Sequence, residues 1–290
     1  MILGVGRLGG REPNYHSPLD LLFLYEADGT TKPTGRSRRQ ERTANNHFFT
    51  QLAQRIVKQL GELTVKGRLY SVEMPLRPIG VGGALAMTFD EFARHFQAAE
   101  SQQTVAPLWQ WQTLCQARPV FGEQTATAAV QNIVQQAIVG RPPLAEDWSE
   151  MRRKRLQLEH GASPHNLKRG PGGALDVEYL VQILQLHHAA QSPQVLVTNT
   201  QAALVALVSA GALSADAAAT LGDAYRFLRR VESGVRLLNT AQRHDVPGDP
   251  AEMQRLALLL GHGNPERLRQ QCLTWMAETR AIFDQLTTSV

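Results

Sequence analysis

The fold of this 290-residue chain is decided near its start by the stretch Gly4-Val5-Gly6-Arg7-Leu8-Gly9-Gly10-Arg11-Glu12, followed by Ser17-Pro18-Leu19-Asp20-Leu21-Leu22-Phe23-Leu24-Tyr25. A short apolar strand runs into a Gly-Gly turn, and a Ser and an acidic residue begin a second apolar strand. Glycine lets backbone N–H groups approach phosphate oxygens. A carboxylate at the head of the following strand can hold Mg²⁺. The stretch therefore predicts a phosphate and metal site between two strands.

Nucleotidyltransferases build their triphosphate and metal site in this way. In that design two aspartates spaced i and i+2 project from one face of a strand, so both carboxylates reach the metal together. Asp20 stands at the second of these positions, but the first is Pro18, which has no ligand atom. The missing carboxylate at position 18 is the central departure of this sequence from the design.

Composition places the chain among globular proteins with few surface charges. Hydrophobic residues make up 43%, charged residues 19%, and the net charge is +4. The two cysteines, Cys115 and Cys272, lie far apart and belong to no Cys-x-x-Cys array, so we expect buried or inert thiols and a cytoplasmic location. There is neither a basic leader nor an apolar run of about 18 residues, which predicts no export and no membrane span. The first strand begins almost at Met1, which suggests that the chain is part of something longer.

The pattern along the chain changes near its middle. Strands are predicted at 2–5, 19–25 and 69–76. The spacing of Phe48, Leu52, Ile56 and Leu60 predicts a helix that ends at Gly61. A capping box formed by Thr88 and Glu91 predicts the start of a second helix, which runs to about Ala99. Beyond Pro142-Pro143 only helical patterns remain, at 177–184, 200–210, 216–243, 251–260 and 265–286. The chain is thus predicted to be α+β, with a mixed-sheet domain over 1–145 and an all-helical domain over 146–290.

Several motifs, in order along the chain, closely resemble the glutamine synthetase adenylyltransferase family. They are Gly6 to Glu12 with Leu19-Asp20-Leu21, Leu76-Arg77-Pro78, Trp109 to Arg118, Lys168-Arg169-Gly170-Pro171-Gly172-Gly173 through Gln182, and Ala224 to Glu232. The resemblance implies one catalytic half of a bifunctional enzyme, with a nucleotidyltransferase domain that starts just inside its usual beginning and a helical domain of the adenylyltransferase/uridylyltransferase type. One half of such an enzyme moves AMP from ATP to a tyrosine of glutamine synthetase, and the other removes it by phosphorolysis, which regulates nitrogen assimilation. The direction stays open.

The resemblance also assigns roles to individual residues. It implies that Asp20 and Glu73 are the catalytic and Mg²⁺-binding carboxylates, although Glu73 stands where the family pattern has aspartate and Pro75 where it has arginine. The residues implied to bind the nucleotide ATP are Gly9, Gly10, Ser17, Arg77, Lys168 and Arg169. The implied partners are glutamine synthetase and a PII-type signal protein, with neither nucleic acid nor membrane.

Each of these assignments has a plainer alternative. Pro18, Glu73 and Pro75 together favour, as a second hypothesis, a catalytically impaired pseudoenzyme that acts as a binding or regulatory module. A nucleic-acid polymerase on the same fold is a third reading, although nothing in the sequence resembles an RNA-binding module. Arg77 could instead form a surface ion pair, and 168–173 could be a tight structural loop. Trp109 and Trp111 could stack on a base, but their alternative is core or interdomain packing. His187-His188 could bind a metal, but their alternative is a solvated helix end.

Overall fold

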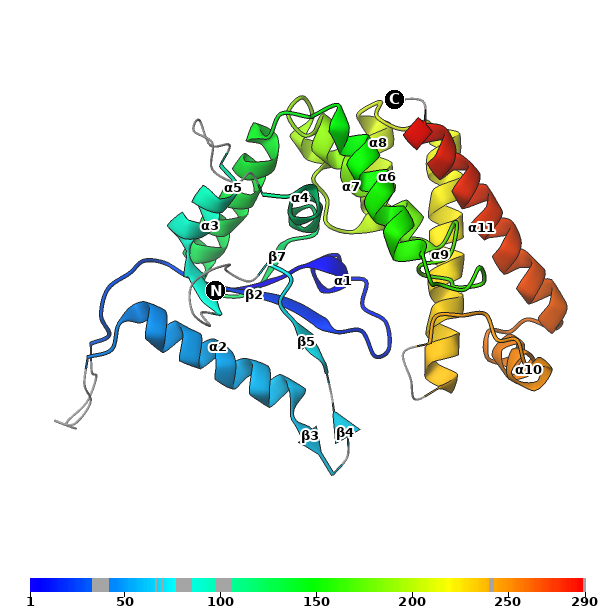
Figure 1. The fold of residues 1–290 in the computed structure, drawn as a ribbon, viewed down its shortest axis with the longest axis horizontal. Coiled ribbons are helices and arrows are strands. Elements are labelled where there is room, and N and C mark those ends of the chain that lie inside the picture. The colour runs from blue at the N-terminus through cyan, green and yellow to red at the C-terminus, as the bar shows by residue number, and fades with distance from the viewer. Residues whose placement is uncertain are drawn as a thin grey trace. The chain divides into compact units, whose positions relative to one another are not determined.

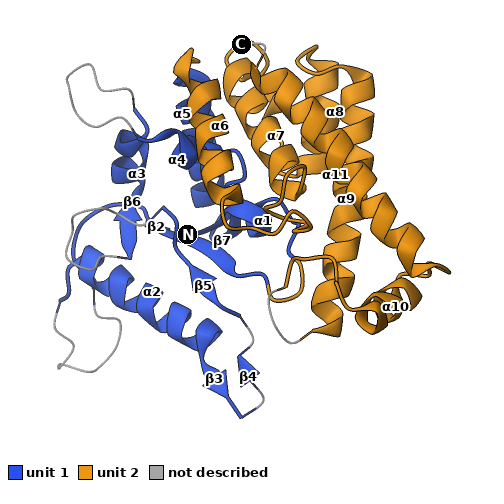
Figure 2. Cartoon of the chain, turned by 45° about the vertical axis from the view of Figure 1, so that its right-hand side comes forward, with its two compact units in different colours: residues 1–13, 17–141 blue, residues 14–16, 142–290 orange. Residues whose placement is uncertain are grey.

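The chain folds into two compact units. The computed structural model describes residues 1–32, 42–65, 67–68, 70–76, 85–97, 106–239 and 243–288. Unit 1 comprises Met1–Pro13 and Ser17–Arg141, and unit 2 comprises Asn14–His16 and Pro142–Val290 (Figure 2). Within the described ranges every strand belongs to unit 1. The predicted order of a mixed-sheet domain followed by helices is therefore confirmed.

A five-stranded mixed sheet organises unit 1 (Figure 1). β1 pairs antiparallel with β2 and with β7, whereas β5 and β6 pair parallel to β2. The strands are β1 (Ile2–Gly4), β2 (Leu19–Tyr25), β5 (Val72–Glu73), β6 (Ala86–Thr88) and β7 (Arg118–Phe121), and a separate hairpin joins β3 (Leu63–Thr64) to β4 (Gly67–Arg68). The strands predicted at 2–5 and 19–25 are confirmed. Of the strand predicted over 69–76, the described residues contain only β5, which stops before Pro75 enters a turn.

One long helix packs its apolar stripe on this sheet. α2 (Asn45–Gly61) lies against β2 and β6, where Ala53 and its neighbours contact Leu21, Phe23 and Tyr25. Its Phe49 ring stacks on Tyr25 at 4.9 Å between ring centroids. The helix ends at Gly61 as predicted. The buried stripe, however, runs through Phe49, Ala53, Ile56 and Leu60, because Phe48 and Leu52 point to solvent.

The remaining helices of unit 1 are short apart from one. Thr88 and Glu91 form the predicted capping box, with the Glu91 N–H donating to Thr88 Oγ1 at 3.0 Å and the Thr88 N–H to Glu91 Oε2 at 2.8 Å. The helix that this box starts ends at His95, before the predicted end at Ala99, which lies outside the described residues. The helices are α1 (Gly6–Gly9), α3 (Phe89–His95), α4 (Leu108–Leu114) and α5 (Gln124–Gly140).

Unit 2 is a helical bundle. Its elements are α6 (Glu146–Glu159), α7 (Ala174–His188), the 3₁₀ turn η1 (Pro193–Val195), α8 (Thr200–Ser209), α9 (Ala215–Leu238), α10 (Pro250–Leu259) and α11 (Pro265–Thr288). In its core, Leu228, Val231 and Val235 of α9 cluster with Cys272 and Met276 of α11. Side chains of Asn199, Ser214 and Asp249 cap α8, α9 and α10 by accepting backbone N–H bonds. The five helices predicted after Pro143 are found as α7 to α11. α9, however, ends at Leu238 and not at the predicted 243, because the backbone of Asn239 is extended (φ −124°, ψ 145°), and α6 was not predicted.

Two further sequence expectations concern burial. Cys115 and Cys272 are both free and buried, and burial raises the pKa of each thiol to about 12, so neither is a reactive thiolate at neutral pH. None of the helices in the described ranges combines the length and the apolar composition that a bilayer crossing requires.

Candidate nucleotide and metal site

The Gly-Gly turn of unit 1 is closed by backbone packing. A side-chain Cβ at Gly9 would lie 1.7 Å from the carbonyl oxygen of Gln116 and 2.6 Å from that of Gly4. The Arg118 guanidinium donates to the carbonyl oxygens of Leu8 and Gly9 at 3.0 and 2.9 Å. Glycine is therefore required at position 9 so that α1 can close between β1 and β7.

The N–H groups of this turn already have acceptors within α1. The Gly9 N–H donates to the Val5 carbonyl at 3.1 Å, and the Gly10 N–H donates to the Gly6 carbonyl at 2.9 Å. The sequence suggested that these two N–H groups would face phosphate. In the structure, Gly9 and Gly10 shape the turn beside the head of β2, and their own donors are engaged there.

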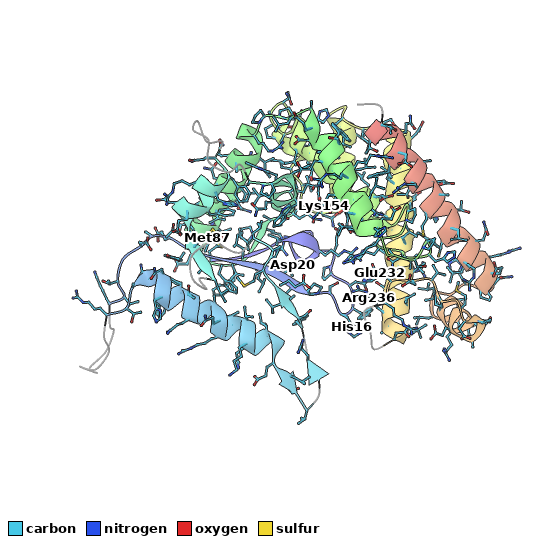
Figure 3. All side chains as sticks on the ribbon, viewed as in Figure 1. His16, Asp20, Met87, Lys154, Glu232 and Arg236 are labelled. Carbon is cyan, nitrogen blue, oxygen red and sulfur yellow. The ribbon has the colours of Figure 1, made fainter. Side chains whose placement is uncertain are left out.

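The two predicted carboxylates are brought together by strand register. Asp20 on β2 and Glu73 on β5 are Cα partners in a parallel pair, so their side chains leave the sheet on the same face. A Cβ at Gly6 would lie 2.8 Å from Asp20 Oδ2, and Gly6 has a φ of +52°. The Asp20 carboxylate therefore lies directly against the start of α1, and Figure 3 labels it on its strand.

A Mg²⁺ ion that comes with a nucleotide fits this pair of carboxylates. Mg²⁺ commonly uses one or two protein carboxylates together with substrate phosphates. Asp20 is half-buried and Glu73 is exposed, so both remain reachable. No cluster of three or more His, Cys, Asp or Glu side chains suited to a metal occurs in the described part of the chain. Asp20 and Glu73 are the residues that would hold one Mg²⁺ shared with phosphate.

The structure describes some, but not all, of the remaining residues predicted to be functional in unit 1. Ser17 is buried, at 7% exposure, two residues before β2 begins. Arg77 lies outside the described residues. Trp111 is buried and donates its Nε1–H to the Ala106 carbonyl at 3.0 Å. The core-packing alternative for Trp111 is therefore confirmed.

Lys168 and Arg169 lie in unit 2, in a loop whose backbone is held by the side chains of Asn166 and Arg155. Asn166 Oδ1 accepts the N–H groups of Lys168 and Arg169 at 3.2 and 2.8 Å. The fully buried Arg155 donates to the carbonyl oxygens of Arg169 and Gly170 at 3.0 and 2.7 Å. The Lys168 side chain is half-buried and that of Arg169 is exposed. This loop therefore has a fixed backbone from which two cationic side chains extend.

The glycines after this loop serve the packing of unit 2. Gly172 has a φ of +71°, and a Cβ there would lie 1.6 Å from the carbonyl oxygen of Met276. Its N–H donates to Asp176 Oδ2 at 2.7 Å. The buried Asp176 carboxylate also pairs with Arg155 at 2.5 Å and with Arg280 at 3.1 Å. Asp176 thus anchors the loop to three helices, which agrees with the structural-loop alternative for the glycines.

A second buried carboxylate, which the sequence analysis did not single out, lies on α9. Glu232 is 1% exposed, and its Oε1 lies 2.7 Å from His244 Nδ1 and 3.6 Å from Arg236. Arg229 forms an ion pair with the other carboxylate oxygen. The sequence signal was present in the Arg-rich stretch before Glu232, but helical spacing alone does not reveal that these side chains turn inward.

The neutral form of His244 fits this cluster. A proton on Nδ1 is donated to Glu232, and Nε2 then accepts from Arg236 at 3.1 Å. Burial lowers the pKa of His244, nearby Arg236 and Lys168 lower it further, and Glu232 opposes them. Because the pKa of His244 is lower in the folded state, the unfolded chain binds the proton more readily. The contribution of neutral His244 to the free energy of unfolding is therefore present above about pH 6.5 and is lost below it.

The consequence can be measured as a pH effect on unfolding. We expect the urea midpoint of the wild-type protein to fall more steeply between pH 7.5 and 5.5 than that of His244→Gln, since only the wild type must charge this imidazole. The control is His160→Gln, which changes an exposed histidine of the same unit. Equal slopes for the wild type and His244→Gln would contradict the assignment of a neutral His244.

Comparisons with known proteins agree with the order of the two units. Residues 1–133 match the family model described as glutamate-ammonia ligase adenylyltransferase, and residues 144–287 match that of GlnD PII-uridylyltransferase. Three similar proteins are each called bifunctional glutamine synthetase adenylyltransferase/adenylyl-removing enzyme. The one from Xanthomonas campestris pv. campestris (strain B100) is 30% identical over 99% of this chain and 30% of its own length.

The other two give the same picture. The protein from Streptomyces coelicolor is 35% identical over 90% of this chain and 25% of its own length. The protein from Stenotrophomonas maltophilia (strain R551-3) is 31% identical over 93% of this chain and 28% of its own length. The chain thus spans about three tenths or less of these relatives while matching them along nearly all of its own length. It belongs to the glutamate-ammonia ligase adenylyltransferase family.

Proposed function

We propose that this chain is part of a nucleotidyltransferase that acts on the AMP–tyrosine linkage of glutamine synthetase, with ATP as a substrate and Mg²⁺ as its metal. The observation that carries this proposal is the parallel register of Asp20 and Glu73 beside the α1 turn. The names of the relatives, which cover both adenylylation and its reversal, support the same reaction class. The match of the second half to a PII-uridylyltransferase model supports a PII-type signal protein as a further partner. We also propose a cytoplasmic location, in keeping with two free thiols.

The proposed chemistry is an in-line displacement at phosphorus. In adenylylation the tyrosine oxygen bonds to the α-phosphorus, the bond from that phosphorus to the bridging oxygen breaks, and pyrophosphate leaves with the bond electrons. In the reverse route an orthophosphate oxygen attacks the phosphorus of the tyrosyl-AMP linkage, which forms ADP. The bond to the tyrosine oxygen breaks, its electrons stay on that oxygen, and the tyrosine takes up a proton. Both routes depend on positioning and on neutralising phosphate oxygens.

Asp20 and Glu73 have different parts in this proposal. Asp20 is fixed by its strand, because the Val5 N–H donates to its backbone carbonyl at 2.9 Å, and we assign it the metal. Glu73 shares that metal and, being exposed on a longer stem, also accepts the proton that leaves the tyrosine. When bound, Mg²⁺ supplies charge neutralisation at the phosphate oxygens. Ser17, Arg77, Lys168 and Arg169 stay in the proposal as nucleotide-binding residues, and Gly9 and Gly10 as the residues that close the turn.

The test combines binding with turnover on one sample. ATP is titrated into the protein by calorimetry with and without Mg²⁺, and the sample is then assayed with labelled ATP for AMP transfer to glutamine synthetase. The same sample is also assayed for phosphate-dependent release of ADP from adenylylated glutamine synthetase. Mg²⁺-dependent binding with either activity supports the proposal. Binding without turnover would instead indicate a docking module, and absence of binding would overturn the nucleotide site itself.

The missing carboxylate gives a prediction of its own. Pro18→Asp is expected to strengthen Mg²⁺-dependent ATP binding by about tenfold, because residue 18 precedes Asp20 by two and an added charged ligand on the same face raises the affinity for a divalent cation. Calorimetry with and without Mg²⁺ measures the change. Pro13→Asp adds the same charge at an exposed position outside this register and serves as the control. Equal affinities for wild type and Pro18→Asp would show that position 18 does not face the metal.

A further inference from the structure

The three residues Asn14–His16 belong to unit 2, although the residues before and after them belong to unit 1. Unit 1 ends at Pro13 and resumes at Ser17. This segment lies between the Gly-Gly turn and β2, which begins one residue after Pro18 and carries Asp20. Whatever holds Asn14–His16 therefore acts on the stretch of chain from which Asp20 extends.

α9 holds this segment by polar contacts at three points. Asn14 Nδ2 donates to Glu232 Oε2 at 3.3 Å, and Ser233 Oγ donates to Asn14 Oδ1 at 2.7 Å. The Arg236 guanidinium donates to the carbonyl oxygen of Tyr15 at 2.6 Å. Positions 232, 233 and 236 lie within about one helical turn, and Figure 3 labels Glu232 and Arg236 on α9. We refer to these contacts as the α9 clamp.

Hydrophobic burial does not account for the α9 clamp. The Tyr15 side chain is 53% exposed, His16 is exposed, and Asn14 is only half-buried. On the α9 side, by contrast, Glu232 and Arg236 are 1% and 2% exposed. Burying charges is costly unless each is paired and hydrogen-bonded, and here part of their hydrogen bonding goes to the segment. The buried charged groups of Glu232 and Arg236 thus hold three residues that are themselves largely exposed.

We propose that Glu232 and Arg236 are positioning residues, which fix the start of β2 and hence the Asp20 carboxylate by holding Asn14–His16. This inference rests on the proposed function, since it concerns the geometry of the proposed metal ligand. Neither residue touches the substrate in this proposal. Both act through the segment, and the effect of losing them should therefore appear first at β2 and then in the metal dependence of the reaction.

The first experiment needs no turnover. Hydrogen exchange, followed by mass spectrometry, is compared between the wild type and Arg236→Ala in peptides covering Ser17–Tyr25, with α7 as the internal reference. Exchange in Ser17–Tyr25 is expected to rise about tenfold in the variant while α7 changes little, because a local restraint is lost and not the fold. Asn14→Ala removes only a neutral amide and leaves the cations around Glu232 in place. It therefore tests the same segment if the Arg236→Ala variant does not fold. Arg226→Ala is the matched control, since Arg226 is an exposed arginine on α9 that pairs with Asp223.

The second experiment separates positioning from simple loss of folded protein. In the transfer assay, Asn14→Ala and Arg236→Ala are expected to raise the Mg²⁺ concentration for half-maximal rate by about fivefold, an effect that a smaller folded fraction would not produce. The positioning role is overturned if the hydrogen-exchange rate of Ser17–Tyr25 is unchanged in both variants. It is also overturned if the exchange rate of α7 rises as much as that of Ser17–Tyr25. If the wild type shows no transfer while exchange responds as described, the proposed function fails and the mechanical link between α9 and β2 stands.

Discussion

Asp20→Asn is expected to lower AMP transfer by about a thousandfold, which is the order of loss seen when one preorganised electrostatic group is removed from an active site. The substitution keeps the size of the side chain and removes its charge, so the proposed Mg²⁺ would lose its strand-fixed ligand. The fold should be unaffected, because the backbone bond between Val5 and Asp20 does not depend on the side chain. The measurement is the transfer rate over a range of Mg²⁺ concentrations.

The matched control for this substitution is Asp90→Asn. Asp90 is an exposed aspartate in the first turn of α3 in the same unit, and its change should leave the rate and its Mg²⁺ dependence within twofold or so of the wild type. A Mg²⁺ response that survives in Asp20→Asn would contradict the metal assignment. It would also remove the observation on which the proposed function rests, since Glu73 alone is a single exposed carboxylate.

The largest expected change in stability comes from Arg155→Ala in unit 2. Arg155 is fully buried, pairs with Asp176 at 2.5 Å and donates to two loop carbonyls. Its removal leaves a buried carboxylate with one fewer cation and should cost about 3–5 kcal/mol of unfolding free energy. A urea titration followed by circular dichroism at 222 nm reports this loss, since the signal comes mainly from helices.

Two further variants make the Arg155 prediction sharper. Arg153→Ala changes an exposed arginine on the same helix and should shift stability by no more than about 0.5 kcal/mol. The double variant Arg155→Met/Asp176→Leu removes both charges and should recover part of the loss, because a buried pair can be replaced by apolar side chains at small cost. A single variant as stable as the wild type would show that the pair contributes nothing to unit 2.

Much of the fold was predictable because its signals are local. The Thr88/Glu91 capping box and the helix end at Gly61 appear where the sequence placed them. After Pro142, α8 to α11 begin within about one residue of the predicted starts, whereas α6 was not predicted and α7 is buried over most of its length. In α2 the spacing gave the helix but not its orientation, because Phe48 and Phe49 both satisfy the pattern and only the contact with Tyr25 selects Phe49.

The features that the sequence did not reveal depend on distant partners. His187 was expected at a solvated helix end, yet its side chain is 17% exposed, its Nε2 lies 3.3 Å from Asp147 Oδ2, and its ring lies beside that of Trp148. The expectation is wrong because the partner comes from another helix, α6, which no spacing within α7 could indicate. The register of Asp20 with Glu73 is of the same kind. The two carboxylates were expected to share a metal by resemblance, and their pairing as neighbours is a property of the sheet.

The excursion of Asn14–His16 into unit 2 also has a consequence for how this protein can be divided or recombined. Residue 141 looks like a natural place to join halves taken from two relatives, but the chain also crosses between the units at 13/14 and 16/17. A chimera joined only at 141/142 would combine the tripeptide of one parent with the α9 residues of the other. The two halves can therefore be exchanged only if positions 14 to 16 are taken from the same parent as the helical half. This short stretch should accordingly be inherited together with helices more than two hundred residues away.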